Sequence, residues 1–217
     1  MSNYKNIKHV CFDLDGTLMD SHKTIYKTTV KTLDELNIKH NLREEELYKR
    51  IGHHFLNIFA DLDITVEDFE HFINIYKGYY FNFIDYSVIY PDALELIKIL
   101  NDKDVAVSLL TTKAQDQAEK ILAYFKMTQM FNYIMGRREG VKTKPSAEPL
   151  LIICSKLSLK ANETLMVGDT ELDIQCGKAA GALTCAVTHG YRTTGQLKFE
   201  QPDLIVKNMK ELITLLE

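Results

Sequence analysis

The chain has 217 residues, of which 46% are hydrophobic and 26% charged, and its formal net charge is −4. This size and composition are typical of a globular protein with one sizeable domain, or one domain that carries a smaller insertion. The basic residues are scattered, and no apolar stretch is long enough for a transmembrane helix. We therefore expect no nucleic-acid partner and no membrane association.

The start of the chain and its cysteines indicate a compartment. The first eight residues are polar and lack the apolar segment of a signal peptide, so we expect a cytoplasmic protein. The cysteines show no metal-site spacing, and each lies in or beside an apolar stretch. We expect buried free thiols rather than disulfides or metal ligands. They are Cys11, Cys154, Cys176 and Cys185.

Two carboxylates follow the first apolar segment of the chain. Residues 7–12 are typical of a buried strand, and Asp13 and Asp15 stand at its carboxyl end, before Gly16, which permits a sharp turn. In an open α/β sheet this is the end at which ligands bind. Neighbouring carboxylates repel unless a cation lies between them or one holds a proton. Asp before Gly is also common in turns, but this pair favours a chemical site.

Residues 21–85 contain no convincing long strand. Apolar residues at helical spacing predict a helix over 24–36, and shorter helices fit 44–51 and 55–62. Residues 65–83 carry aromatic side chains at helical spacing, which indicates core packing rather than a cofactor site. We expect a helical insert in this part of the chain.

From residue 86 onward strands and helices alternate. The predicted helices cover 91–100, 114–125, 146–157 and 172–180, and the predicted strands cover 105–110, 131–135, 164–167, 183–187 and 204–206. Such alternation favours an α/β fold, a parallel sheet with helices on both faces. We expect residues 1–20 and 86–217 to form this core and residues 21–85 to form an inserted all-helical domain.

Three later segments carry further candidate site residues. Thr111 and Thr112 end a predicted strand, where a hydroxyl and free amides hold phosphate oxygens, although Thr is also an ordinary helix cap. Lys144, beside Pro145, would neutralise phosphate and an acid together, and Lys142 is a nearby rival. Most lysines, however, are solvated surface residues.

A second acidic pair closes the predicted strand 164–167. Asp169 stands at the strand end and Asp173 one helical turn later, so that both carboxylates can face one metal site. Alternatively, Asp169 caps the following helix.

These segments, in this order, resemble those of the haloacid dehalogenase-like hydrolases. They are Asp13-Leu14-Asp15-Gly16-Thr17-Leu18, the hydroxyl residue Thr111, Lys144-Pro145, and Gly168-Asp169-Thr170 with Asp173. The helical insert and Thr188-His189-Gly190-Tyr191 are similar to the phosphoglycolate-phosphatase-like branch, which has a helical cap. The resemblance covers essentially the whole chain and implies a Rossmann-like core with an inserted cap.

The resemblance also implies a role for each residue. Asp13 would be the nucleophile that becomes an aspartyl-phosphate, and Asp15 the general acid and then the general base. Thr111 and Thr112 would bind phosphate. Lys144 would steady the negative charge at the nucleophile and the phosphate.

The implied cofactor is Mg²⁺. The resemblance assigns it to Asp13, the backbone carbonyl of Asp15 and Asp169, with Asp173 in support. Independently of the resemblance, phosphoryl transfer gathers negative charge, and Mg²⁺ prefers oxygen ligands such as these. The absence of soft ligands in this set argues against zinc.

The loop with Gly52, His53 and His54 lies between two predicted cap helices. We expect it to touch the substrate, although paired histidines at a helix end are also ordinary surface residues.

The function that the sequence favours is a Mg²⁺-dependent phosphatase. Its substrate would be a small phosphorylated metabolite, such as phosphoglycolate, a sugar phosphate or a nucleotide. The alternatives are a phosphomutase similar to β-phosphoglucomutase, an inorganic pyrophosphatase, or a binding protein without activity. The presence of all the acids and the lysine argues against the last. We expect a monomer or a homodimer.

Overall fold

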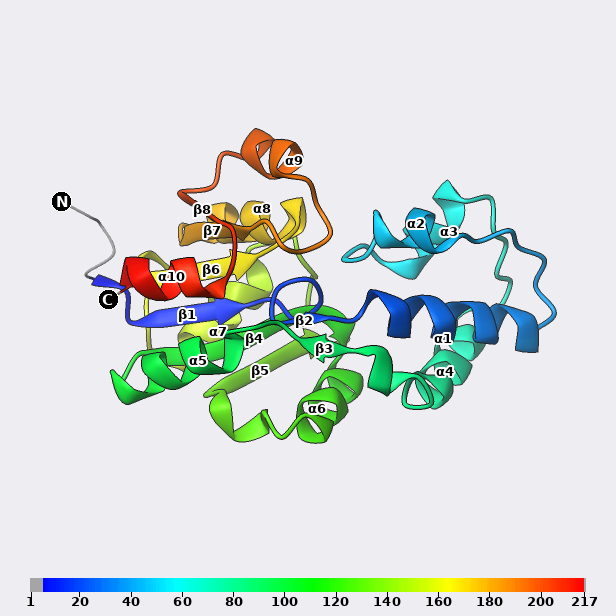
Figure 1. Cartoon of the computed structure of the whole chain (residues 1–217), viewed down its shortest axis with the longest axis horizontal. Helices are drawn as coiled ribbons and strands as arrows, with labels where there is room; N and C mark the ends of the chain where they lie inside the picture. Colours follow the sequence, from blue (N-terminus) through cyan, green and yellow to red (C-terminus); the bar gives the residue numbers. More distant parts are fainter. Residues whose placement is uncertain (1–5, 217) are drawn as a thin grey trace. The chain divides into compact units, whose positions relative to one another are not determined.

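The computed structural model describes residues 6–216 and divides the chain into two compact units (Figure 1). One unit combines Met1–Leu18 with Ile89–Glu217, and the other is Met19–Val88. These limits lie close to the expected division at residues 20 and 86. Residues 1–5, which hold most of the polar start of the chain, and residue 217 lie outside the described residues.

The first unit contains a six-stranded sheet in the order β5-β4-β1-β6-β7-β8, and every pair of neighbouring strands is parallel. The strands are nearly continuous apolar runs, because helices cover both faces of a parallel sheet. Their bounds are β1 (His9–Phe12), β4 (Ala106–Ala114), β5 (Tyr133–Arg137), β6 (Thr164–Gly168), β7 (Leu183–Val187) and β8 (Leu204–Val206).

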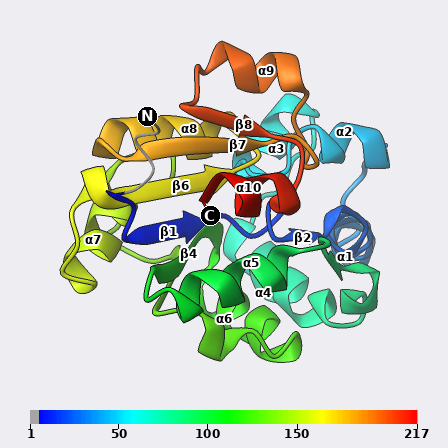
Figure 2. The same cartoon turned by 60° about the vertical axis from the view of Figure 1, so that its left-hand side comes forward.

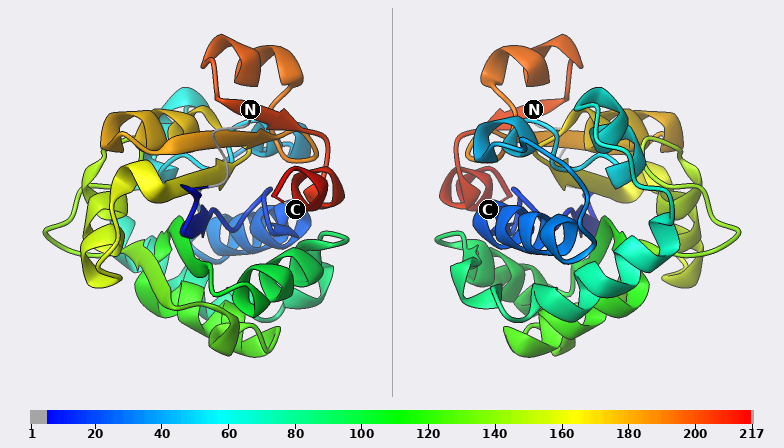
Figure 3. Two further views of the ribbon diagram at one scale, coloured as in Figure 1. Left: turned by 90° about the vertical axis from the view of Figure 1, so that its left-hand side faces the viewer. Right: turned by 90° about the vertical axis from the view of Figure 1, so that its right-hand side faces the viewer.

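Helices pack on both faces of this sheet, as Figure 3 shows. Helices α7 and α8 contact each other on one face, and α5 and α10 contact each other on the other. Their bounds, with those of the remaining helices, are α5 (Ala93–Asp102), α6 (Gln115–Tyr124), η3 (Thr128–Met130), α7 (Glu148–Lys156), η4 (Ala161–Glu163), α8 (Glu171–Ala180), α9 (Thr194–Phe199) and α10 (Met209–Leu216). This architecture confirms the expected α/β fold.

Strand β1 lies in the middle of the sheet, between β4 and β6 (Figure 2). Phe12 is in register with Leu109 of β4 and with Val167 of β6. Because the strands are parallel, the residues that follow these three positions meet at one edge of the sheet. This is the carboxyl edge, at which open α/β sheets bind ligands.

The observed elements differ from the predicted ones in a few places. Strand β4 continues to Ala114, beyond the predicted end at residue 110. Helix α5 begins at Ala93, after Asp92 in the left-handed conformation (φ +63°), so Pro91 lies outside the helix. Helices α9 and α10 were not predicted. The α10 pattern is nevertheless in the sequence, since Met209, Leu212 and Ile213 share one buried helix face.

The second unit is helical. Its elements are α1 (His22–Glu35), α2 (Glu44–Tyr48), α3 (Phe55–Asp61), α4 (Phe69–Tyr80) and η2 (Ile84–Tyr86). The strands β2 (Met19–Asp20) and β3 (Val88–Ile89) pair where the chain passes between the units. The aromatic residues form core, as predicted, because Phe72, Tyr76 and Tyr80 are buried and Phe72 meets Phe59 edge to face at 5.0 Å between ring centroids.

All four cysteines are buried free thiols, which confirms that prediction. Within residues 6–216, each helix is too short or too polar to cross a membrane.

Candidate active site

Asp13 is the first residue after β1 and lies at the centre of the carboxyl edge. Its amide donates a hydrogen bond to the Val167 carbonyl at 2.9 Å, which continues the pairing of β1 with β6 past the end of the strand. Its side chain is almost completely buried. The position of the carboxylate therefore follows directly from the strand register.

The turn after Asp15 brings Thr17 back to the sheet. Gly16 has φ +87°, a conformation that favours glycine, and a Cβ there would overlap the Asp169 carboxylate. Because of this close approach, the buried Thr17 hydroxyl reaches Asp169 and donates to its Oδ1 at 3.0 Å.

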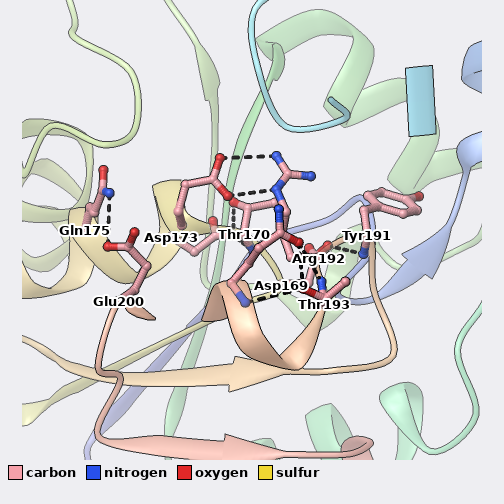
Figure 4. A network of polar contacts seen from close by, with 10 residues as sticks. Asp169, Thr170, Asp173, Gln175, Tyr191, Arg192, Thr193 and Glu200 are labelled. Atoms are coloured by element: carbon pink, nitrogen blue, oxygen red, sulfur yellow. Dashed lines mark hydrogen bonds and ion pairs between the residues drawn. The ribbon is translucent and has the colours of Figure 1, made fainter. Parts of the chain in front are cut away.

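Asp169 follows the last residue of β6 and is completely buried. Its second oxygen, Oδ2, accepts the Tyr191 amide at 2.8 Å, from the loop after β7 (Figure 4). That loop is held to the start of α8 by Arg192, whose Nε donates to Glu171 Oε2 at 2.7 Å. Asp169 does not cap helix α8, because the cap residue is Thr170.

Asp173 belongs to the first turn of α8. Its Oδ2 accepts from the Thr170 amide at 3.0 Å and from the Thr170 hydroxyl at 2.6 Å. Its Oδ1 accepts from Lys144 Nζ at 2.5 Å, and the same ammonium donates to Asp13 Oδ1 at 2.6 Å. Lys144 is thus a bridge between two acids rather than a solvated surface lysine.

Asp13, Asp169 and Asp173 form a buried cluster in which one oxygen of each lies within 4.8 Å of the others. Burial raises the pKa of Asp13 to about 7, against the opposing effect of Lys144. Burial and the charge of Asp13 raise the pKa of Asp169 well above its usual value. Burial acts to lower the pKa of Lys144, but Asp13 and Asp173 raise it overall.

The charges of this cluster match a divalent cation. If all three carboxylates were ionised, they would face one ammonium and leave two negative charges in a place with little access to water. Such an arrangement is costly unless protons or a cation compensate the charges. All the donors are carboxylate oxygens, which suit hard cations such as Mg²⁺.

Thr111 lies in β4, beside β1, and is 3% exposed. Its hydroxyl oxygen accepts the Lys113 amide at 3.2 Å, which leaves the hydroxyl hydrogen to donate to another oxygen. Thr112 is half-buried in the same strand. Neither residue caps a helix, since the cap residue of α6 is Ala114.

Asp15 lies beside a lysine that the sequence analysis did not single out. The Asp15 side chain is 9% exposed, and Asp15 Oδ2 lies 3.3 Å from Lys113 Nζ. This ion pair joins the loop after β1 to the end of β4.

Gly52, His53 and His54 belong to the other unit. Gly52 has φ +102° and turns the chain after α2, and His54 is the N-cap of α3, where its side chain accepts the Leu56 amide at 3.3 Å. The His54 ring also lies 5.2 Å from the Phe69 ring.

The structure thus brings Asp13, Lys144, Asp169 and Asp173 into direct or near contact, with Thr111 in the next strand. Residues that contact these acids or Asp15 but were missed as site residues include Thr17, Lys113, Thr170 and Tyr191. Thr17 and Tyr191 lie in segments that carry the family resemblance, which was the available signal. For Lys113 the only signal was its position two residues after Thr111.

A parallel α/β core with a lysine-bridged acid cluster at its carboxyl edge is the framework of an enzyme that acts on phosphate groups. The chain belongs to the haloacid dehalogenase-like hydrolase family, whose sequence pattern matches residues 10–187. This membership confirms the resemblance that the sequence analysis drew.

Similar proteins support the same family. A pyrophosphatase PpaX from Bacillus pumilus is 30% identical over 214 residues and covers 98% of both chains. A phosphoglycolate phosphatase from Aquifex aeolicus is 29% identical over 211 residues and covers 96% of both. Among solved structures, a haloacid dehalogenase-like hydrolase from Streptococcus pneumoniae matches with a TM-score of 0.86 at 22% identity, over 98% of this chain and 99% of the other, which shows the fold.

Proposed function

We propose that this protein is a Mg²⁺-dependent phosphatase that hydrolyses a small phosphorylated metabolite through an aspartyl-phosphate at Asp13. The observation that carries this proposal is the lysine bridge: Lys144 Nζ joins Asp13 to Asp173 inside a buried acid cluster. The curated relatives, which are named as phosphatases and pyrophosphatases, support the same class of reaction.

In the first step, Asp13 Oδ2 attacks phosphorus, because Oδ1 of the same carboxylate accepts a hydrogen bond from Lys144 Nζ. A bond forms between Asp13 and phosphorus, the bond from phosphorus to the leaving oxygen breaks, and Asp15 gives that oxygen a proton. The Thr111 hydroxyl donates a hydrogen bond to a phosphoryl oxygen. Lys144 keeps the negative charges of nucleophile and phosphate from repelling each other.

In the second step, water attacks phosphorus and Asp15 takes its proton. The bond between Asp13 and phosphorus breaks, inorganic phosphate leaves, and Asp15 is ready to act as the acid again. The buried position of Asp13 limits the access of other nucleophiles.

Asp13, Asp169 and the backbone carbonyl of Asp15 would hold Mg²⁺. Asp173 would support this site by its charge and by fixing Lys144, whose Nζ donates to its Oδ1. A bound Mg²⁺ would supply the positive charge that lets a carboxylate approach an anionic phosphoryl group.

Pyrophosphate is a second candidate substrate beside phosphoglycolate. It is favoured by the name of the relative from Bacillus pumilus, to which this chain is 30% identical over nearly its whole length. Both compounds are small and carry a second anionic group next to the phosphoryl group that is transferred.

We propose that residues 21–85 select the substrate as a cap, with Gly52, His53 and His54 in the contacting loop. Because His54 also caps α3, its replacement by Asn keeps a capping group while removing the imidazole. The double variant His53→Ala with His54→Asn should change the ranking of substrates. Unchanged kinetics on every substrate would refute the role of this loop.

Four buried free thiols are typical of proteins in a reducing compartment, and we propose a cytoplasmic location.

The deciding experiment is phosphate release from pyrophosphate and a panel of phosphate esters, with Mg²⁺ and with chelator. We expect Mg²⁺-dependent turnover concentrated on one or two compounds. A folded protein that releases no phosphate from any of them would contradict the proposal. Transfer of the phosphoryl group to a sugar hydroxyl instead of water would favour a phosphomutase.

A further inference from the structure

The side chain of Lys113 places a second ammonium at the carboxyl edge of the sheet. Lys144 contacts Asp13 and Asp173, whereas Lys113 Nζ lies 3.3 Å from Asp15 Oδ2. Both side chains of this second pair are only 9% exposed. The two lysines therefore lie beside different acids, one at the nucleophile and one at the proton donor.

The backbone that carries Lys113 is held on both sides. Its amide donates to Thr111 Oγ1 at 3.2 Å, so Lys113 and Thr111 have a fixed mutual position. On the other side, Gly136 of β5 approaches so closely that a Cβ there would lie 2.9 Å from the Lys113 carbonyl oxygen.

The contact with β5 is itself secured by Gln115. Its Oε1 accepts the Gly136 amide at 2.6 Å and Arg138 Nε at 3.0 Å. Arg138 also donates to the Ile134 carbonyl at 3.0 Å and so ties Gln115 to β5. An ammonium on such a fixed backbone needs little ordering before it binds a charged group.

The position of Lys113 beside Asp15 defines what it would touch. A general acid must lie within hydrogen-bond distance of the oxygen that it protonates. With Asp15 as the proton donor, a group 3.3 Å from its carboxylate would lie within reach of the leaving group.

We propose that Lys113 binds the leaving group and selects substrates in which this group carries its own negative charge, a phosphate or a carboxylate close to the bridging oxygen. The inference rests on the proposed function, because it needs Asp15 as the proton donor. An ammonium has three N–H donors, so Lys113 can keep its contact with Asp15 while it binds a second anion. A neutral leaving group gives this ammonium no second charge to bind.

The test uses two esters that differ only in this charge. Phosphoglycolate has a carboxylate in its leaving group, and hydroxyethyl phosphate has a neutral hydroxymethyl group in the same place. For the unaltered enzyme we expect kcat/KM to be about 10 to 100 times higher for phosphoglycolate, the factor that one charge-assisted hydrogen bond supports. Pyrophosphate should be treated like phosphoglycolate.

The substitution Lys113→Met should reduce this ratio at least about 10-fold, and a 10-fold change corresponds to about 1.4 kcal/mol of binding to the anion. Lys113→Arg keeps the charge and should retain most of the ratio. Lys120→Met is the matched control, because it removes a lysine from the exposed face of α6 and should leave the ratio unchanged.

Binding gives a readout that does not depend on turnover. In an Asp13→Asn background, which still presents Asp15 and Lys113, calorimetry should show phosphoglycolate binding more weakly after Lys113→Met, with hydroxyethyl phosphate affected less. If Lys113→Met lowers kcat/KM equally for both esters, Lys113 acts only through Asp15 and the proposal is wrong. Absence of phosphate release from pyrophosphate and from every ester of the panel by the unaltered enzyme would instead refute the proposed function.

Discussion

Thr17 donates a hydrogen bond from Oγ1 to Asp169 Oδ1 at 3.0 Å, although 152 positions of sequence separate the two residues. The contact is completely buried and joins the loop after β1 to the end of β6. Together with the Tyr191 amide on the other oxygen, it fixes the orientation of the Asp169 carboxylate before any ligand binds. The Asp169 carboxylate is thus preorganised by groups that carry no charge.

Thr17→Val should destabilise the protein by about 1–3 kcal/mol, because it leaves a buried carboxylate oxygen without its donor. It should also raise the Mg²⁺ concentration needed for half-maximal activity, since Asp169 loses its fixed orientation. Chemical denaturation in chelator and a Mg²⁺ titration of activity measure the two effects. Thr17→Ser keeps the hydroxyl and should retain most of both properties. A larger effect of Thr17→Ser than of Thr17→Val would show that the methyl group, not the hydrogen bond, is what matters.

Asp13→Asn should reduce turnover by a factor of about a thousand or more, because an amide is not a nucleophile toward phosphorus at neutral pH. The fold should survive, since Lys144 keeps its contact with Asp173 and one buried negative charge is removed. Phosphate release and thermal unfolding measure both outcomes. Substantial activity in a preparation free of the unaltered enzyme would contradict the role of Asp13.

Most of the candidate site could be predicted from the sequence because its residues lie at or near the carboxyl ends of strands. Asp13 and Asp169 follow β1 and β6, Thr111 lies in the last part of β4, and the alternation of strands and helices predicted that such ends meet at one edge. Periodicity does not report which strands are neighbours. Only the structure places β1 between the other two and so brings Asp13 next to Asp169.

The parts that were missed depend on contacts between distant segments. Strand β4 was predicted to end at residue 110 because Thr111, Thr112 and Lys113 are polar, and apolar periodicity detects only the part of a strand that lies in the core. Helix α9 has only six residues, which is too short for a periodic signal. The contact between Lys113 and Asp15 carries no local pattern at all.

Asp169→Asn should weaken the response to Mg²⁺ and the rate together, because it removes one negative charge from a cluster whose charges match a divalent cation. In the unaltered protein we expect Mg²⁺ to raise the melting temperature, since an ion that binds the folded state stabilises it. This increase should be largely lost in the variant. Asp203→Asn, at the far side of the sheet beside Thr184, is a control in which the Mg²⁺ response should persist. An unaltered Mg²⁺ titration in Asp169→Asn would remove this residue from the metal site.

His9 should make the stability of the core sensitive to mildly acidic pH. The ring is completely buried in β1, with Nδ1 3.0 Å from Thr164 Oγ1 and Nε2 2.7 Å from Ser108 Oγ. Burial lowers the pKa of His9 from 6.5 to about 4. Between pH 6.5 and about pH 4, His9 binds a proton in the unfolded chain but not in the folded chain. Stability contributed by the neutral ring is therefore complete above pH 6.5 and decreases as the pH falls toward 4.

The loss from this one group amounts to roughly 3 kcal/mol, at about 1.4 kcal/mol for each pKa unit. His9→Gln replaces the ring by an amide that cannot titrate, so the free energy of unfolding of the variant should fall less between pH 7 and pH 4.5. His71→Gln, on the exposed face of α4, is the matched control and should follow the unaltered protein. Urea denaturation at several pH values measures the three curves. The interpretation fails if the curve of His9→Gln runs parallel to that of the unaltered protein, because the acid sensitivity would then come from other groups, such as the carboxylates that lose their charge in the same range.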